Sequence, residues 1–510
     1  MEIIWSTVLT VWGWLLDHLL YINLAFSIII IFFQRRDPRS VWTWLLALYF
    51  IPVFGIVFYL LFGQDMKKSR MFRVKEVSDR LNLPVKSQED IIRSDDMPEE
   101  MMDPMSRDFK SLIIYNLETS GSVLTVNNQV QIYTDGQAKF EALRNALRQA
   151  RRFIHIQYYI IKNDELFDSI VPILLDKVRE GVEVRILCDG MGGRFMPKKR
   201  WDQMRRAGIK VGVFFPPFLG WLNLRVNYRN HRKIVVVDGA AGFVGGFNIG
   251  REYISRDPKF GYWRDTHLEI KGEAAISLQI RFALDWNYVT GENLFKEIRY
   301  FGEEAEYARR RLNGRIHAVW PDPEHVSEMV CMQIITSGPD TREPHIRNNY
   351  LELFHKAKHH IYIQTPYFIP DDAIFSSLKI AALSGVDVRL MIPCKPDHPF
   401  VYWATCSYAG ELLDYGARVY VYENGFLHSK GIMIDGRVSC YGTANMDIRS
   451  FELNFEVNAT IYDEDVTGQL EEAFMNDLPH CREITREEYG DRNLWMRIKE
   501  QSSRLLSPLL

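Results

Sequence analysis

One α/β unit is repeated within the chain from about residue 128 onward, and this duplication restricts the fold more than any other feature. Segments 141–160 and 348–368 each have the pattern of an amphipathic helix followed by a strand that carries a glutamine, Gln157 or Gln364. Further strands recur in the same order, at 181–190 and 385–394 and at 210–215 and 418–423. Two copies predict two similar lobes related by a pseudo-twofold axis, and they are too few for a solenoid.

Both copies contain the same spaced set of polar residues. In segments 231–248 and 428–445 a histidine is followed by lysine two residues later, aspartate seven later, glycine fourteen later and asparagine seventeen later. These residues are His231, Lys233, Asp238, Gly245 and Asn248 in the first copy and His428, Lys430, Asp435, Gly442 and Asn445 in the second. Histidine and lysine at i and i+2 of a strand leave the same face, so they are expected to converge on one ligand.

A site that joins both copies favours chemistry at phosphorus. Lysine and asparagine donate hydrogen bonds to phosphate oxygens, and imidazole exchanges protons near neutral pH. One imidazole can attack phosphorus while the other protonates the departing alkoxide. The sequence lacks GxSxG and HExxH patterns and carboxylates at ligand spacing, so acyl transfer and metal-dependent hydrolysis are not favoured and no metal or cofactor is expected.

Composition excludes several classes of protein. The chain has 510 residues, 47% of them apolar, which is enough for two or three ordinary domains and excludes disordered, collagenous and disulfide-scaffold classes. A net charge of −3 gives no broad attraction to nucleic acid, so nucleic acid is not an expected partner. The six cysteines show no metal-ligand spacing and are expected to be reduced thiols.

The doubled HxKxxxxD pattern resembles the signature of the phospholipase D superfamily. Within that superfamily, nearly the whole chain is similar to the bacterial cardiolipin synthases, in the segments NYRNHRKIVVVDG, WRDTHLEIKG, PYFIPD, GFLHSKGIMIDG, GTANMDIRSFELNFE and the final SPLL. The resemblance implies two α/β lobes, each a mixed sheet flanked by helices, with the active site at their junction. It also implies an enzyme that converts two phosphatidylglycerol molecules into cardiolipin and glycerol through a phosphohistidine intermediate.

The resemblance also implies roles for individual residues. His231 would be the nucleophile and His428 the general acid and then the base, an order that follows the superfamily because the sequence does not distinguish the two. Lys233, Lys430, Asn248 and Asn445 would bind the phosphate oxygens. Asp238 and Asp435 complete the catalytic motifs, where an orienting or supporting role is expected.

Further residues near the motifs are predicted to take part in the substrate-binding site. Asp265 and Glu456 occupy matching places after their motifs, and each is predicted to hydrogen-bond the other lobe's histidine. Gly246 and Thr443 are predicted to lie near the phosphate, although a plain turn explains them nearly as well. Arg232 belongs to a segment, 214–233, that mixes aromatic residues with arginines and favours a loop that dips among lipid headgroups.

The first 65 residues predict a transmembrane hairpin. Val41–Phe62 is an uncharged run of 22 residues, long enough to span the hydrocarbon layer of about 30 Å, and a first helix at about 12–33 precedes a second at about 41–62. A signal peptide is the weaker alternative, because a basic segment before the apolar run is missing. Pro52 and Gly55 leave a re-entrant second segment open.

The remaining boundaries follow from composition and from the duplication. A polar linker is expected at 66–115, the first lobe at 116–322, the second lobe at 323–485 and an amphipathic tail at 486–510 that either lies on the membrane or packs against a lobe. The resemblance implies a multi-pass protein of the bacterial inner membrane with anionic lipid as a partner. Five basic residues within 67–75 outnumber Arg35, Arg36 and Arg39 in the turn between the helices and so favour cytoplasmic lobes. No oligomeric state is predicted.

Two rival functions remain open. The same scaffold with water or another alcohol as acceptor would be a phospholipase D hydrolase or a different phosphatidyltransferase, and the choice depends on how the cleft excludes water. A nucleic-acid phosphodiesterase is less favoured because of the hairpin and the net charge.

Overall fold

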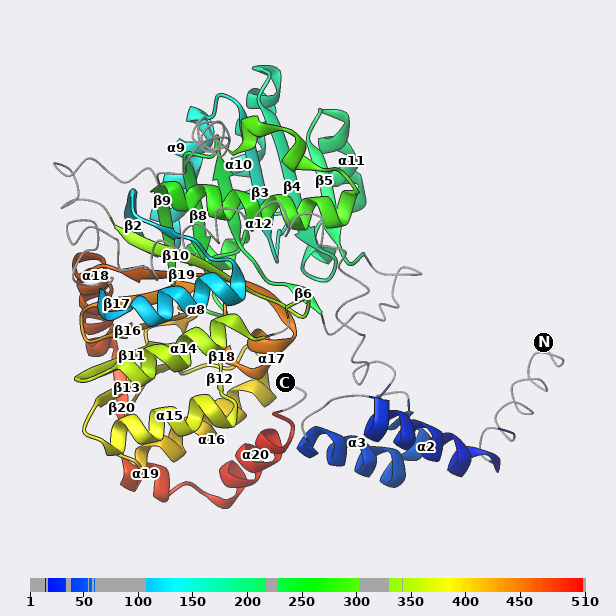
Figure 1. The fold of residues 1–510 in the computed structure, drawn as a ribbon, viewed down its shortest axis with the longest axis vertical. Helices are drawn as coiled ribbons and strands as arrows, with labels where there is room; N and C mark the ends of the chain where they lie inside the picture. Colours follow the sequence, from blue (N-terminus) through cyan, green and yellow to red (C-terminus); the bar gives the residue numbers. More distant parts are fainter. Residues whose placement is uncertain are drawn as a thin grey trace. The chain divides into compact units, whose positions relative to one another are not determined.

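The computed structural model describes residues 14, 17–33, 38–53, 55–56, 59, 107–216, 228–301, 330–341 and 343–507 (Figure 1). These residues belong to two compact units, one made of the described residues up to 59 and the other of those from 107 to 507. Residues 66–106 of the predicted linker at 66–115, parts of the two predicted N-terminal helices and residues 217–227 of the arginine-containing loop lie outside the described residues.

The N-terminal unit contains two packed apolar helices. α2 (Leu19–Ile28) continues into a π-helical turn, η1 (Ile29–Phe33), and α3 is Pro38–Phe50. The buried Asn23 donates a hydrogen bond from Nδ2 to the carbonyl of Leu48, at 2.8 Å, which ties α2 to α3. Among the described residues, no helix combines the length and the apolar character that crossing a membrane requires.

The larger unit is built around two mixed sheets. The first sheet has the order β15-β9-β8-β7-β3-β4-β5, with β2 paired to β9. Its strands are β2 (Asn128–Asp135), β3 (Phe153–Tyr158), β4 (Glu183–Asp189), β5 (Lys210–Phe214), β7 (Ile234–Val237), β8 (Ala241–Gly245), β9 (Trp263–Gly272) and β15 (Phe426–Leu427).

The second sheet repeats this order with strands mainly from the second half, to which the first half adds β1 and β6. It runs β1-β10-β19-β17-β16-β11-β13-β14-β20, with β6 paired to β19. Its strands are β1 (Leu124–Thr125), β6 (Arg229–Asn230), β10 (Cys331–Ser337), β11 (His360–Gln364), β13 (Asp387–Pro393), β14 (Arg418–Tyr422), β16 (Gly431–Ile434), β17 (Val438–Gly442), β19 (Asn454–Tyr462) and β20 (Cys481–Ile484). The series β9-β8-β7-β3-β4-β5 therefore matches β19-β17-β16-β11-β13-β14, which confirms the predicted pair of similar α/β lobes. A separate pair joins β12 (Phe368–Ile369) to β18 (Met446–Asp447).

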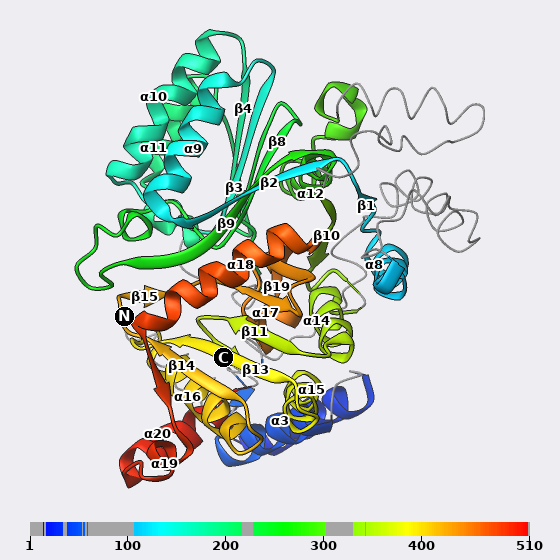
Figure 2. The same ribbon diagram turned by 90° about the vertical axis from the view of Figure 1, so that its left-hand side faces the viewer.

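Helices cover the outer faces of both sheets (Figure 2). In the first half these are α9 (Gly136–Gln149), α10 (Glu165–Arg179) and α11 (Lys198–Arg206), with the short turns η3 (Gly192–Phe195) and η4 (Arg251–Ile254). In the second half they are α14 (His345–Lys356), α15 (Asp372–Leu383) and α16 (Pro399–Leu413). Short elements and a terminal helix complete the chain: η5 (Leu294–Lys296), η6 (Ile298–Tyr300), α17 (Ile448–Glu452), η8 (Leu478–His480), α19 (Arg486–Gly490) and α20 (Leu494–Leu505).

Two matching helices fill the space between the sheets and join the halves into one body. They are α12 (Glu273–Thr290) and α18 (Glu464–Asp477), each directly after the longest strand of its sheet. One continuous apolar core includes Leu278 and Phe282 of α12, Leu470 and Phe474 of α18, and side chains from both sheets. Burial of this shared core fixes the position of one lobe on the other.

The structure differs from the sequence-based boundaries at the start of the first lobe. Helix α8 (Lys110–Ser120) begins inside the segment expected to be linker, and its buried Asn116 donates to Gln333 and Asn349 of the second half. Strand β1 pairs with β10. The segment before β2 thus completes the core of the second lobe, because its apolar side chains Leu112, Ile113 and Leu117 are buried there.

Candidate active site

Two short strands place the histidines of both motifs at the junction of the lobes. β6 ends at Asn230, immediately before His231, and pairs in parallel with the start of β19 in the second half. β15 ends at Leu427, immediately before His428, and pairs in parallel with the start of β9 in the first half. Each motif therefore pairs with the other half just before its histidine and enters its own sheet just after it, at β7 or β16, and this exchange brings the two motifs together.

His231 is held by a carboxylate from the second half. Its Nδ1 lies 2.9 Å from one oxygen of Glu456 and 3.1 Å from the other. Thr443 donates to Glu456 from Oγ1 at 2.6 Å. Lys233 donates from Nζ to the carbonyl of His231 at 2.6 Å. With Nδ1 engaged, Nε2 is the ring nitrogen left for substrate.

His428 has the equivalent arrangement, with its carboxylate partner from the first half. Its Nδ1 lies 2.6 Å from Oδ2 of Asp265, and Lys430 donates from Nζ to the carbonyl of His428 at 2.5 Å. The Lys430 Nζ also lies 2.8 Å from His428 Nδ1. The ring centroid of Trp263 is 5.1 Å from that of His428. The structure thus confirms the predicted pairing of each acid with the histidine of the other lobe.

Electrostatics leave the imidazoles neutral and the carboxylates ionised. Burial lowers the pKa of His231 and lowers that of His428 to about 4, and nearby lysines lower both further. Burial alone raises the pKa of Asp265 and of Glu456, but the facing lysines and histidines hold each below its ordinary value. A neutral imidazole that donates its Nδ1 proton to a carboxylate keeps a lone pair on Nε2, as a nucleophile or base requires.

The two lysines titrate near neutral pH. Burial lowers the pKa of Lys233 to about 7 and that of Lys430 to about 8, and each lysine lowers the pKa of the histidine in the other motif. The two motifs therefore share one electrostatic environment. A bound phosphate would favour the charged form of both lysines.

The two motif asparagines have different hydrogen-bond partners. Asn248 accepts from the backbone N–H of Ile160 and donates to the Tyr253 hydroxyl. Asn445 donates to Asp447, and its buried side-chain oxygen has no partner in the structure. Gly246 is required for space, because a Cβ there would lie 1.9 Å from Oδ1 of Asp265.

Asp238 and Asp435 have one role in common, which is structural. Each lies in the left-handed region at φ 55° and accepts three backbone N–H groups from the start of the neighbouring helix-to-strand turn. Asp238 binds the N–H groups of Arg151, Arg152 and Phe153. Asp435 binds those of residues 358–360. They brace the far ends of the motif strands, in agreement with the supporting role expected for them.

Arg232 points away from the place expected for it. Its side chain is fully buried, and it binds Asp285 and the backbone carbonyls of Glu456 and Ser337. The prediction of a substrate-binding arginine rested on the mixed aromatic and basic composition of the loop, which does not show the direction of one side chain. All three side-chain nitrogens of Arg232 donate to protein acceptors, so Arg232 holds the backbone of the site in place and does not point toward the substrate position.

Sequence reasoning missed Tyr159, which forms one side of the site. Its ring packs edge-on against His231 with centroids 5.0 Å apart, and the Lys233 Nζ lies 5.7 Å from the ring centroid. Tyr159 comes two residues after Gln157, and the repeat has Tyr367 three residues after Gln364. An aromatic residue soon after the repeated glutamine was the available signal.

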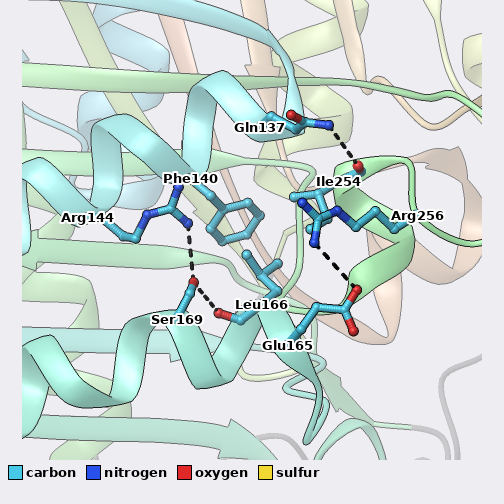
Figure 3. A pocket seen from close by; sticks show the side chains of 8 residues that line it. All are labelled: Gln137, Phe140, Arg144, Glu165, Leu166, Ser169, Ile254 and Arg256. Carbon is cyan, nitrogen blue, oxygen red and sulfur yellow. Dashed lines mark hydrogen bonds and ion pairs between the residues drawn. The ribbon is translucent and has the colours of Figure 1, made fainter.

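A separate surface pocket of about 250 Å³ lies between α9 and α10 (Figure 3). Its lining includes Phe140, Leu166 and Arg144, and Arg144 donates to Ser169 at 3.2 Å. None of the predicted site residues lines it. Within the described part of the chain, no group of three His, Cys, Asp or Glu side chains is placed to hold a metal ion.

Comparisons with known proteins agree with this geometry. A model of the cardiolipin synthase phospholipase D-like domain matches residues 143–266 and again 350–478, and a phospholipase D-nuclease N-terminal model matches 22–64. The major cardiolipin synthase ClsA of Bacillus subtilis is 44% identical over 506 residues, which cover 97% of this chain and 99% of that protein. A cardiolipin synthase of Staphylococcus aureus is 46% identical, over 96% of this chain and 95% of the relative.

The chain belongs to the cardiolipin synthase family. It is thus an enzyme of the phospholipase D type, as the doubled motif indicated. A phosphatidylserine synthase of Haemophilus influenzae shares the fold, with a TM-score of 0.57 at 16% identity over 80% of this chain and 98% of that one. The two matches to the phospholipase D-like domain model correspond to the two lobes of this chain.

Replacing Glu456 by Gln tests whether the carboxylate orients His231. Gln keeps the size of the side chain but presents an N–H that competes with the Nδ1 proton, so kcat is expected to fall by roughly 10- to 100-fold. The measurement is phospholipid product formation per minute by the purified variant. Unchanged turnover would show that the hydrogen bond to His231 has no orienting role.

The pKa values of Lys233 and Lys430 predict a pH dependence. Raising the pH through 7 and 8 removes the protons that make these lysines cationic, so phosphate binding weakens and kcat/KM should fall by about tenfold or more between pH 7 and 9. Toward acid, both lysines are already charged and His428, with its pKa lowered to about 4, takes up the proton that it donates more readily, so kcat/KM should not fall between pH 7 and 5. The rate is measured on short-chain substrate, and a kcat/KM that rises up to pH 9 would contradict the prediction.

Proposed function

We propose that the chain transfers a phosphatidyl group between two phosphatidylglycerol molecules and releases cardiolipin and glycerol. The observation that carries the proposal is the paired arrangement of His231 with Glu456 and His428 with Asp265, in which each acid comes from the other half. Two imidazoles at one junction, each with Nε2 left for substrate, suit a double displacement at a phosphodiester. The family membership supports the same reaction.

The first step forms a phosphohistidine. Binding of the anionic phosphodiester raises the pKa of His428, so its Nε2 takes up a proton. Nε2 of His231 then attacks phosphorus, the bond between phosphorus and the departing glycerol oxygen breaks, and His428 donates this proton to that oxygen. Lys233, Lys430, Asn248 and Asn445 bind the nonbridging oxygens as charge develops on them.

The second step reverses the proton transfer. The glycerol hydroxyl of another phosphatidylglycerol attacks phosphorus, His428 removes its proton, and the bond from phosphorus to His231 breaks. The number of phosphodiester bonds is unchanged, so the reaction is expected to run in both directions. Attack by water in place of the lipid alcohol would give phosphatidic acid.

We place this enzyme in the bacterial inner membrane, anchored by a transmembrane hairpin within residues 1–65, with its lobes in the cytoplasm. The match of the N-terminal family model over residues 22–64 and the uncharged run at 41–62 support the anchor. The lobes would follow a linker, as the sequence-based boundaries have it. Anionic lipid is the partner, and nucleic acid is not.

The C-terminal helix α20 supports a second contact with the lipid surface. Its polar side is buried, with Glu500 1% and Ser503 2% exposed, and Arg504 forms an ion pair with Glu411 of α16 at 2.6 Å. Its apolar side faces outward, with Leu494, Trp495, Ile498 and Leu505 between 45% and 81% exposed. The tail thus packs against a lobe and still presents an apolar stripe, which suits an interfacial helix on anionic lipid.

Product analysis tests the proposed reaction. Purified protein supplied with phosphatidylglycerol alone should yield cardiolipin and glycerol in equal amounts, and His231→Ala should lower the rate by at least about 10³-fold. His359→Ala, at an exposed histidine outside the motifs, is the matched control and should retain the rate. An acid-labile label from phosphate-labelled lipid should appear on the wild-type chain.

Three outcomes would count against this assignment. Phosphatidic acid with glycerol as products would mean that water is the acceptor. A label that persists in the His231→Gln variant would exchange the roles of the two histidines. Steep salt-dependent binding of an oligonucleotide would favour the nucleic-acid alternative.

The variant Trp495→Ser with Ile498→Ser tests the role of α20. A fully buried apolar side chain of this size contributes about 1.5–3 kcal/mol, so partial insertion of two predicts a fall of roughly tenfold in the rate on phosphatidylglycerol vesicles. The rate on short-chain soluble substrate should not change, and Gln501→Ser on the same exposed side is the control. An equal loss on both substrates would argue against a lipid contact.

A further inference from the structure

The two glutamines repeated in the sequence have equivalent positions in the structure. Gln157 on β3 donates from Nε2 to Asp285 of α12 at 2.7 Å. Gln364 on β11 donates from Nε2 to Asp477 of α18 at 2.8 Å. Strands β3 and β11 match in the two sheets, as do helices α12 and α18, so the two pairs are related by the pseudo-twofold symmetry.

Each of these carboxylates binds a buried arginine. Arg232 donates from Nη1 to both oxygens of Asp285, at 2.9 and 2.8 Å. Arg264 donates from Nε to Asp477 at 3.0 Å, and its Nη2 lies 2.8 Å from the other oxygen. Both arginine side chains are almost fully buried.

The arginines also bind the backbone of the acids that hold the histidines. Arg232 donates from Nε to the carbonyl of Glu456, the partner of His231, at 3.1 Å. Arg264 donates from Nη1 to the carbonyl of Asp265, the partner of His428, at 2.7 Å. A chain of hydrogen bonds thus runs from glutamine to aspartate to arginine to the acid behind each histidine.

The two arginines come from different positions of the repeat. Arg232 follows the first motif histidine, where the second motif has Ser429. Arg264 precedes the acid of the first half, where the second half has Phe455 before Glu456. On the His231 side, an arginine follows the histidine and a phenylalanine precedes the acid. On the His428 side, a serine follows the histidine and an arginine precedes the acid.

The packing around Arg232 differs from the packing around Arg264. The guanidinium of Arg232 lies over the ring of Phe455, 5.2 Å from its centroid. On the other side, Ser429 hydrogen-bonds Thr266 through the two hydroxyls at 2.7 Å, and Arg264 donates to the same Thr266 oxygen at 3.1 Å. Asp285 also binds Arg281 at 2.6 Å, whereas Arg264 is the arginine that binds Asp477, so an arginine at position 429 beside Arg264 would place a second buried cation next to one carboxylate.

We propose that the two sets Gln157–Asp285–Arg232 and Gln364–Asp477–Arg264 are positioning residues that hold Glu456 and Asp265 at their histidines. This proposal rests on the proposed function. None of these six side chains touches the reacting atoms; they act through the backbone of the two acids. A buried ion pair contributes little net stability, so its value here is the fixed geometry.

Because the arginine follows the histidine on one side and precedes the acid on the other, moving the arginine of the His428 side to the other position can restore the activity that its loss removes. Arg264→Phe leaves Asp477 without its cation, and kcat on phosphatidylglycerol should fall by about 10- to 100-fold while KM changes less than about twofold. Ser429→Arg alone adds an unpaired cation and should also lower kcat. The double variant Arg264→Phe with Ser429→Arg reproduces the residues of the His231 side and should recover at least about tenfold of the loss.

Two further variants keep the test decisive if Arg264→Phe does not fold. Asp477→Asn preserves shape and removes the charge, and Gln364→Met removes the donor to Asp477 together with the acceptor of the Tyr441 hydroxyl. Both should lower kcat with an unfolding temperature close to that of the wild type. The matched control is Arg389→Phe, since Arg389 forms an ion pair with Asp387 at the surface of the same lobe. Wild-type kcat in Asp477→Asn, or a double variant that folds and is no faster than Arg264→Phe, would overturn the proposal.

Product identity separates this proposal from the proposed function. If the wild type releases phosphatidic acid, the proposed acceptor is wrong, but the losses and the rescue of kcat can still be read in the rate of glycerol release. If cardiolipin forms normally and the rescue fails, the proposed reaction stands and the positioning role is wrong.

Discussion

Two hydrogen bonds across the junction of the lobes, from His231 to Glu456 and from His428 to Asp265, are the interactions on which the whole site depends. Neither half of the chain contains a complete pair of histidine and acid. The short strands β6 and β15 bring about the exchange, because each pairs with the other half's longest strand directly before the histidine. The shared apolar core of α12 and α18 then holds the two lobes in this relative position. Packing outside the active site therefore fixes the catalytic geometry.

The duplication was sufficient to predict most of this arrangement. A matched order of elements gave two similar sheets, and the i, i+2 spacing placed histidine and lysine at the start of a strand. Asp265 and Glu456 could be paired with the opposite histidines because they occupy equivalent places in the repeat, and symmetry leaves few other partners. Asp238 and Asp435 were expected to orient or support the site because they come after their strands, and both bind backbone N–H groups.

Where the two copies differ, the partners of individual side chains could not be predicted from the sequence. Arg232 has no counterpart in the second motif, so its partner could not be inferred by comparison of the repeats, and Asp285 lies 53 residues further along the chain. Helix α8 was not predicted from the sequence, for another reason. Its polar residue Asn116 is buried because Gln333 and Asn349 satisfy it, and a polar side chain in a sequence looks exposed until its partners are known.

The electrostatic design of the site follows from how much charge is buried together. Two lysines and two carboxylates lie with two imidazoles at the junction, and burial disfavours every charged form. The carboxylates stay ionised because cations face them, while the pKa values of the lysines fall to about 7 and 8. An arriving phosphodiester supplies the missing negative charge, so substrate and protons bind together. The site is therefore most fully charged when occupied, and the donors that stabilise the transition state reach full strength only once the lipid phosphate is in place.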